Sequence, residues 1–218
     1  MRSANTFTTV AFQLSQPRPV RLAHHLHAPA QVIAGVRRGI PVLMPVRAPR
    51  DAVISGVIRA PQLSLRQALD GYRRFHEAVL PYRDSCHVAT FEQVTSDLGA
   101  VIDRLNERFG TAYARFEHTP ENVQRVYDLI EEKSRDPEHA DAIRRYFSGV
   151  ISAEQLAQAR GASHVNDGAG AVPEHRVARP SREREETSRE LAERYDAPDL
   201  AKLRRRAEAA YERLASRP

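Results

Sequence analysis

The stretch "IPVLMPVRAPRDAVISGVIR", residues 40–59, decides the fold because it joins an apolar run to an amphipathic one through a short turn. Residues 40–46 carry no polar side chain, which is typical of a strand buried on both faces of a parallel sheet. Pro49 suits the first turn of a helix, and we predict that helix over residues 50–59. A strand, a turn and a helix in this order form the repeating unit of α/β folds.

Similar units lie on both sides of this stretch. Apolar side chains at helical spacing predict helices over residues 28–39, 64–85 and 96–110. Three further apolar segments predict strands, namely residues 7–14 (a strand or another buried segment), 20–25 and 86–91. We therefore expect an α/β fold with a mostly parallel sheet flanked by helices.

Beyond residue 113 the chain is more charged, and helices are predicted from Pro120 onward. We assign residues 1–160 to the α/β domain and residues 161–180, which are rich in glycine and small side chains, to a flexible loop. Residues 181–218 are expected to form C-terminal helices that pack on the domain. The last of these helices carries an apolar stripe made of Leu200, Leu203, Ala207, Ala210, Tyr211 and Leu214.

Composition and charge narrow the class of protein. The 218 residues carry a net charge of +5, but basic and acidic side chains are interleaved, so we expect no nucleic-acid partner. The single cysteine, Cys86, excludes an internal disulfide framework and predicts a buried structural thiol in a reducing cytoplasm. No apolar run reaches the roughly 18–20 residues of a membrane helix, and the first residues lack a signal-peptide pattern. The expectation is a cytoplasmic protein, whose oligomeric state the sequence leaves unknown.

Arg47 follows the predicted strand directly, and Ser55 follows eight residues later in the predicted helix. In parallel sheets ligands bind at the carboxyl ends of the strands, where helix N-termini favour anions. Arg47, the start of the helix and Ser55 can therefore converge on one phosphate, with Arg50 as a further cation. The alternative is an ordinary βα turn in which Arg50 is solvated and Ser55 has no ligand.

A histidine-rich stretch, "AHHLHAP", comes before this unit and contains His24, His25 and His27. A neutral histidine beside a hydroxyl is a natural general base, because its reference pKa lies near neutral pH. A metal site is the weaker alternative, because no carboxylate lies nearby in the sequence to complete a ligand set. The third alternative is that these side chains only pack or face solvent.

Together these motifs resemble those of sulfotransferases that use 3'-phosphoadenosine 5'-phosphosulfate (PAPS). "VLMPVRAPRDAVIS", residues 42–55, looks like the family's 3'-phosphate-binding segment, in which a strand ends in arginine and a serine follows eight residues later. "AHH", residues 23–25, stands where the family has "K-T-H". "CHVATFEQVTSDLGAVIDRLNERFG", residues 86–110, is similar to a later strand, turn and helix, and residues 176–195 look like the C-terminal region of bacterial relatives.

The resemblance implies a P-loop NTPase-like fold and transfer of a sulfuryl group from PAPS to a hydroxyl or amine of a small-molecule or glycan acceptor. His25, with His27 as its substitute, would be the catalytic base. Arg47 and Ser55 would bind the donor's 3'-phosphate, aided by Arg50 and by two arginines of the C-terminal loop, Arg176 and Arg179. No metal is implied.

The sequence departs from the family at the other half of the donor site. No G-x-x-x-x-G-K-[ST] motif occurs, and Ala23 stands where the family has its lysine. We therefore expect either an N-terminally truncated sulfotransferase, with an incomplete α/β domain, or a relative that has lost or rebuilt the 5'-phosphosulfate-binding P-loop. Its activity is doubtful in this form. The alternative is a non-catalytic nucleotide-binding or interaction protein that keeps the 3'-phosphate corner of the fold.

Overall fold

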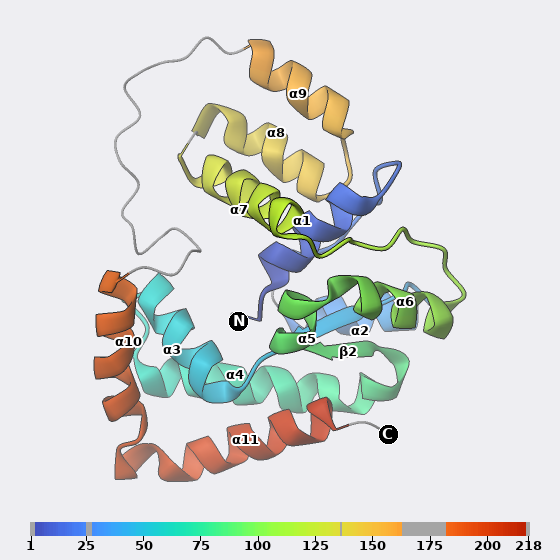
Figure 1. The fold of residues 1–218 in the computed structure, drawn as a ribbon. Helices are drawn as coiled ribbons and strands as arrows, with labels where there is room; N and C mark the ends of the chain where they lie inside the picture. The colour runs from blue at the N-terminus through green and yellow to red at the C-terminus, as the bar shows by residue number, and fades with distance from the viewer. Residues whose placement is uncertain (1–2, 25–27, 136, 163–181, 217–218) are drawn as a thin grey trace.

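Two short parallel strands lie at the centre of the molecule, β1 (Leu43–Val46) and β2 (His87–Thr90). Leu43 lies opposite His87 and Val46 opposite Thr90, so both strands end at the same edge of the sheet. The computed structural model describes residues 3–24, 28–135, 137–162 and 182–216, and these residues are mostly helical around the strand pair (Figure 1). The predicted parallel strand–helix–strand arrangement is confirmed, although the sheet in the described residues is smaller than predicted.

The helices next to the sheet match the predicted ranges closely. Ser64 and Thr90 cap two of them with reciprocal side-chain and backbone hydrogen bonds to Gln67 and Gln93. Gly110 ends another in the left-handed region, with φ of 62°. The elements are α2 (Pro29–Arg37), α3 (Pro49–Arg59), α4 (Leu65–Val79), the 3-10 helix η1 (Leu80–Ser85), α5 (Phe91–Ser96) and α6 (Leu98–Phe109).

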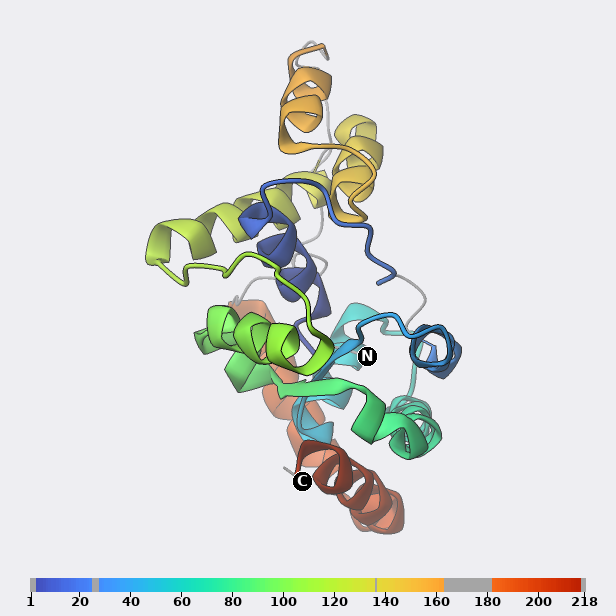
Figure 2. The same cartoon turned by 90° about the vertical axis from the view of Figure 1, so that its right-hand side faces the viewer.

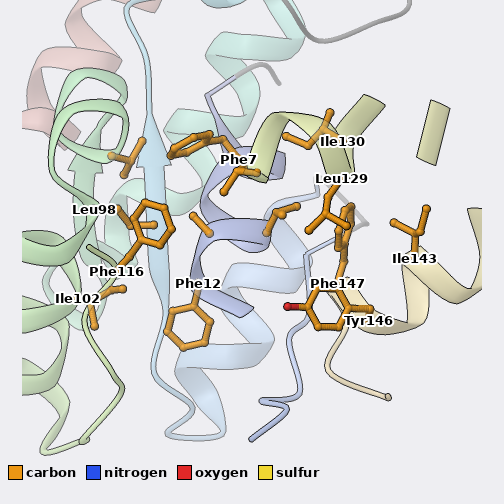
Figure 3. Packing of buried hydrophobic residues seen from close by; sticks show 14 of the residues in the cluster. Phe7, Phe12, Leu98, Ile102, Phe116, Leu129, Ile130, Ile143, Tyr146 and Phe147 are labelled. Atoms are coloured by element: carbon orange, nitrogen blue, oxygen red, sulfur yellow. The ribbon is translucent and has the colours of Figure 1, made fainter. Parts of the chain in front are cut away.

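A second group of helices lies on the side of α5 and α6 that faces away from α4, at the top of Figure 1. It consists of α1 (Asn5–Ser15), α7 (Pro120–Arg135), α8 (Pro137–Phe147) and α9 (Ala153–Ala162). Phe7 and Phe12 of α1 lie between the side chains of α6 and those of α7 and α8 (Figure 3). One hydrophobic cluster therefore joins this group to the helices that follow β2.

Two predicted strands are wrong, although the alternative prediction for residues 7–14, another buried segment, is confirmed. Residues 7–14 belong to helix α1 and are buried over most of their length, including the polar Thr8, Thr9 and Gln13. A helix that is buried on all sides shows no exposed polar face with a period of 3.6 residues, so the sequence favoured a strand. Residues 20–24 of the strand predicted over residues 20–25 pair with no strand of the described residues. Instead Leu22 N–H donates to the carbonyl of Ser148 (3.1 Å), in the turn after α8.

The C-terminal helices return to the sheet side of the molecule. α10 (Arg182–Tyr195) packs against α3, the 3-10 helix η3 (Pro198–Leu200) follows it, and α11 (Ala201–Ala215) runs along α4 (Figures 1 and 2). Leu214 of α11 is fully buried in a cluster that includes Met44, Val46 and Val79. Residues 163–180 of the predicted loop lie outside the described residues.

Within the described part of the chain, no helix is both long enough and apolar enough to cross a membrane.

Candidate anion-binding site

The carboxyl ends of the two strands bring Arg47 and Phe91 together, since each residue directly follows its strand. The guanidinium carbon of Arg47 lies 4.1 Å from the centroid of the Phe91 ring. A guanidinium over an aromatic face is attracted by the ring's electron density and is held in a defined orientation. The Phe91 ring therefore positions the Arg47 guanidinium at the edge of the sheet.

The hydrogen-bonding capacity of Arg47 is largely unused. Its Nε is buried and has no hydrogen-bond partner among the described residues. The nearest carboxylate oxygen belongs to Asp51, one helical turn later, and lies 3.9 Å from a terminal nitrogen of Arg47. Since N⁺–H···O⁻ hydrogen bonds are about 2.7–2.9 Å long, Asp51 attracts this guanidinium without forming a close pair.

The backbone of Arg47 is fixed from the opposite side by α4. The buried hydroxyl of Tyr72 donates a hydrogen bond to the Arg47 carbonyl (2.7 Å). The Tyr72 ring in turn stacks on His76, with centroids 3.9 Å apart. Burial raises the pKa of Tyr72, so the hydroxyl stays protonated and remains a donor at neutral pH. The turn that presents Arg47 is therefore fixed by the core of the protein.

Helix α3 adds its N-terminus to the same corner. It begins at Pro49, directly after the Arg47–Ala48 turn, and no described side chain caps its first backbone N–H groups. Uncapped N–H groups and the helix dipole favour an anion here, and Asp51 in the first turn supplies part of that negative charge. Arg47 and the start of α3 thus form a corner that can bind a phosphate or sulfate group.

The other residues predicted for this site have different surroundings. Arg50 forms an ion pair with Asp196 (2.9 Å), which joins the start of α3 to the residue after α10. Ser55 lies partly buried in the middle of α3, about two helical turns after Arg47. The structure therefore brings Arg47, Asp51 and Phe91 together and directs Arg50 toward the C-terminal helices.

His25 and His27, together with Arg176 and Arg179, lie outside the described residues. The neighbouring His24 is described: its carbonyl accepts a hydrogen bond from the Asn5 side chain (3.0 Å), and its Nε2 lies 3.4 Å from the Ser148 hydroxyl. The role of a histidine as base stays a prediction.

Phe91 and Tyr72 are site residues that the sequence did not reveal as such. Phe91 had a usable signal, because residues that directly follow two paired parallel strands lie side by side. Tyr72 had none, because its position in the helical pattern of α4 indicates only that it is buried. Its hydrogen bond to Arg47 depends on how α4 packs against β1 and α3.

Cys86 is buried, as predicted, and burial raises the pKa of its thiol to about 11. Among the described residues, no group of three or more His, Cys, Asp or Glu side chains is arranged to bind a metal ion.

Comparisons of the chain with models of protein families, with curated proteins and with solved structures gave no match. The function is therefore inferred from the site itself.

Proposed function

We propose that Arg47 and the N-terminus of α3 bind the 3'-phosphate of an adenosine nucleotide, and that the protein is a sulfotransferase-like transferase that uses PAPS as its sulfuryl donor. The observation that carries the proposal is the Arg47 side chain: 23% exposed, oriented by Phe91, and with a buried Nε that has no partner in the described residues. The acceptor would be a hydroxyl or amine of a small molecule or glycan.

Charge and hydrogen bonding both support an anionic ligand at this corner. A buried polar atom without a partner costs about 1–3 kcal/mol, and a tetrahedral oxyanion that accepts from Arg47 would remove that cost. A guanidinium binds a phosphate through parallel hydrogen bonds, whereas Asp51 at 3.9 Å makes no such close contact. A bound phosphate would therefore form contacts with Arg47 that no described residue forms.

In the proposed reaction the acceptor oxygen or nitrogen attacks the sulfur of PAPS, and the bond from sulfur to the bridging phosphate oxygen breaks. The products are the sulfated acceptor and adenosine 3',5'-bisphosphate. The acceptor proton passes to His25 or His27. Arg47 and the start of α3, with Ser55 in a supporting role, keep the donor in place through its 3'-phosphate, because transfer of this kind depends on positioning and on charge stabilisation. Arg50 is paired with Asp196 and has no part in this step.

A second candidate function is nucleotide binding without transfer. Helix α1 favours it, because Phe7, Val10 and Phe12 bury this segment in the hydrophobic core. In sulfotransferases, as the resemblance implies, the corresponding part of the chain is a strand–loop–helix that binds the 5'-phosphosulfate. Helix α1 supplies no such loop, so the described residues offer the nucleotide-binding corner without a group that stabilises a transferring sulfuryl group.

Calorimetric titration of the full chain with adenosine 3',5'-bisphosphate tests the binding proposal. We expect measurable binding, and a loss of at least about tenfold in affinity with Arg47→Ala, since a hydrogen bond to a charged group contributes about 1.5–3 kcal/mol. Adenosine 3'-monophosphate should bind in the same Arg47-dependent manner, whereas adenosine 5'-monophosphate should bind more weakly.

Arg66→Ala is the matched control, because Arg66 is exposed and paired with Asp199 on the far side of α4 (2.9 Å). This variant should bind the bisphosphate as the parent does. Equal affinity in the parent and in Arg47→Ala, or no preference for the 3'-phosphate, would exclude this site.

Transfer is tested separately by incubating the protein with PAPS labelled in the sulfuryl group and a panel of phenolic, amine and glycan acceptors. Labelled product that depends on His25 or His27 supports the transferase. Bisphosphate binding with no labelled product for any acceptor supports the second candidate.

A further inference from the structure

An open groove of about 570 Å³ lies at the far end of α3 from Arg47, where α3, the α3–α4 connection and α10 meet. Its volume falls within the range of about 300–1,000 Å³ that is usual for small-molecule sites. α10 lies beside α3 along this side of the molecule (Figure 1). The groove is therefore a feature separate from the corner at Arg47.

The groove has an apolar floor. Val57 and Ile58 of α3, Leu65 of α4 and Leu191 of α10 line it and belong to one buried cluster. Leu63 forms part of its wall with 40% of its surface exposed, one of three large hydrophobic side chains with such exposure in the described residues. An apolar ligand would cover Leu63 and extend the cluster, which is favourable by about 25 cal/mol for each Å² of apolar surface removed from water.

Among the described residues, a single charged side chain lines the groove. Arg194, on the same face of α10 as Leu191, is the only charged residue among those that line it in the described part of the chain. The side chain of Arg194 is exposed and forms no ion pair or hydrogen bond with another described residue, whereas its carbonyl accepts a hydrogen bond from Ala197 N–H (3.3 Å). The remaining polar lining consists of neutral side chains such as Gln62 and Thr187.

We infer that this groove is a second ligand site, which binds a small amphipathic anion with an apolar body and one carboxylate or sulfonate. The apolar body lies on Val57, Ile58 and Leu191, and the anionic end pairs with Arg194. Charge complementarity selects this class, since a cationic amphiphile would meet only a positive charge and a neutral one would leave that charge unused. The site does not depend on nucleotide binding at Arg47.

Three chemical probes of equal chain length test the site in the full-length protein: octanoate, octan-1-ol and octylammonium. Methyl NMR spectra recorded during titration should show shifts of Val57, Ile58, Leu63 and Leu191 with octanoate. Octan-1-ol should shift the same methyl groups, and its affinity should be lower than that of octanoate by at most about fivefold. This difference corresponds to the loss of one exposed charge pair. Octylammonium should bind least.

Two variants separate the charge from the apolar surface. Arg194→Gln should lower the affinity for octanoate to that for octan-1-ol and leave octan-1-ol unchanged, whereas Leu63→Ser should weaken both ligands. Arg189→Gln is the matched control, because Arg189 is exposed on α10 and does not line the groove. Octanoate affinity that is unchanged in Arg194→Gln, shifts outside the groove, or equal binding of octanoate and octylammonium would overturn the inference.

Discussion

Arg47 combines a rigid setting with unused hydrogen-bonding capacity. The ring of Phe91 lies against its guanidinium and the hydroxyl of Tyr72 fixes its carbonyl, while its Nε is buried without a partner in the described residues. Such preorganisation lowers the entropy cost of binding, because the side chain is already ordered before the ligand arrives. Arg47→Lys should not preserve this arrangement, since an ammonium group has neither the planar fork of a guanidinium nor the same stacking on Phe91.

Asp51 is the competitor of any anion at this corner. Its carboxylate lies 3.9 Å from Arg47 and in the first turn of α3, where it repels a second negative charge. Asp51→Asn should therefore tighten the binding of adenosine 3',5'-bisphosphate by about two- to fivefold. It should also lower the free energy of unfolding by about 0.3–1 kcal/mol, because the helix dipole loses its partner.

Calorimetry and urea unfolding measure the two effects. Asp84→Asn serves as the control, since the Asp84 side chain is 89% exposed in η1 and pairs with Arg83. Weaker binding in Asp51→Asn would show that Asp51 helps to position Arg47 and does not compete with the ligand.

Because the His76 ring is buried, we expect the protein to lose stability in mild acid. Its ring is 1% exposed, it stacks on Tyr72, and its Nε2 has no partner in the described residues. Burial lowers its pKa from 6.5 to about 4. The unfolded chain therefore binds the proton at a higher pH than the folded protein does. The contribution of neutral His76 to the free energy of unfolding is complete above pH 6.5 and is lost as the pH falls from 6.5 toward 4. The loss is on the order of 3 kcal/mol.

Urea unfolding at several pH values between 7.5 and 4.5 measures this slope. His76→Phe keeps an aromatic ring against Tyr72 and has no titrating group, so its stability should vary less over this range. Burial also lowers the pKa of His87, which titrates in both proteins, so the difference between them isolates His76. Parallel slopes would contradict the assignment.

At the scale of elements, the turn between α8 and α9 fixes the segment that leads out of α1. Gly149 in this turn has φ of 67°, and the carbonyl of Val20 lies directly against it. The side chain of Gln13 also donates to the Val20 carbonyl, and Leu22 N–H donates to Ser148. The close approach of residues 20–22 therefore depends on a position without a side chain.

Gly149→Ala should destabilise the protein by about 3 kcal/mol or more, because a Cβ at this position would overlap the Val20 carbonyl and because the left-handed region disfavours alanine. Gly110→Ala is the matched control: its φ is 62°, and no atom lies within 4 Å of the added Cβ. It should cost only the conformational term of about 1–2 kcal/mol. Thermal unfolding of both variants compares their stabilities. A similar loss of stability in both would mean that the Val20 carbonyl moves aside at little cost.

The same elements show what the sequence could predict. Helices with one apolar face, such as α4 and α6, were predicted correctly because burial on one side leaves a period of 3.6 residues. α1 was not, because residues on all its faces are buried by partners that come later in the chain. The segment 20–24 was predicted as a strand because its short apolar pattern does not reveal that its partner is a helical turn.

As with the fold, the parts of the site that depend on local sequence were predictable, and the contacts between distant segments were not. Arg47 at a strand end follows from the local pattern, and the start of α3 follows from Pro49. The ion pair of Arg50 with Asp196 joins residues 146 positions apart, and no local pattern contains such a contact. The distant partners of the corner therefore emerge only from the packing of α4, α10 and α11.

At the scale of the whole molecule, α11 covers the strands. Leu214 is fully buried beside Met44, Val46 and Val79, and the carbonyl of Leu214 accepts a hydrogen bond from Arg83 (3.1 Å). Leu214→Ala should lower the free energy of unfolding by about 2–5 kcal/mol, because it leaves a cavity next to β1. Leu203→Ala, at a partly buried position of the same helix, should cost less than about 2 kcal/mol.

Urea unfolding of the two variants gives the comparison. A Leu214→Ala variant as stable as the parent would mean that α11 contributes little to the sheet side of the fold.

The return of α11 to β1 also sets an order of events during protein synthesis. Met44 and Val46 leave the ribosome well over a hundred residues before Leu214 does, and until then this face of the strands lacks its cover. Contacts so distant in sequence form slowly, and uncovered apolar strands are prone to aggregate. We expect the nascent chain to need a chaperone at this face, and a ribosome stalled after residue 200 should present it in a protease-sensitive state.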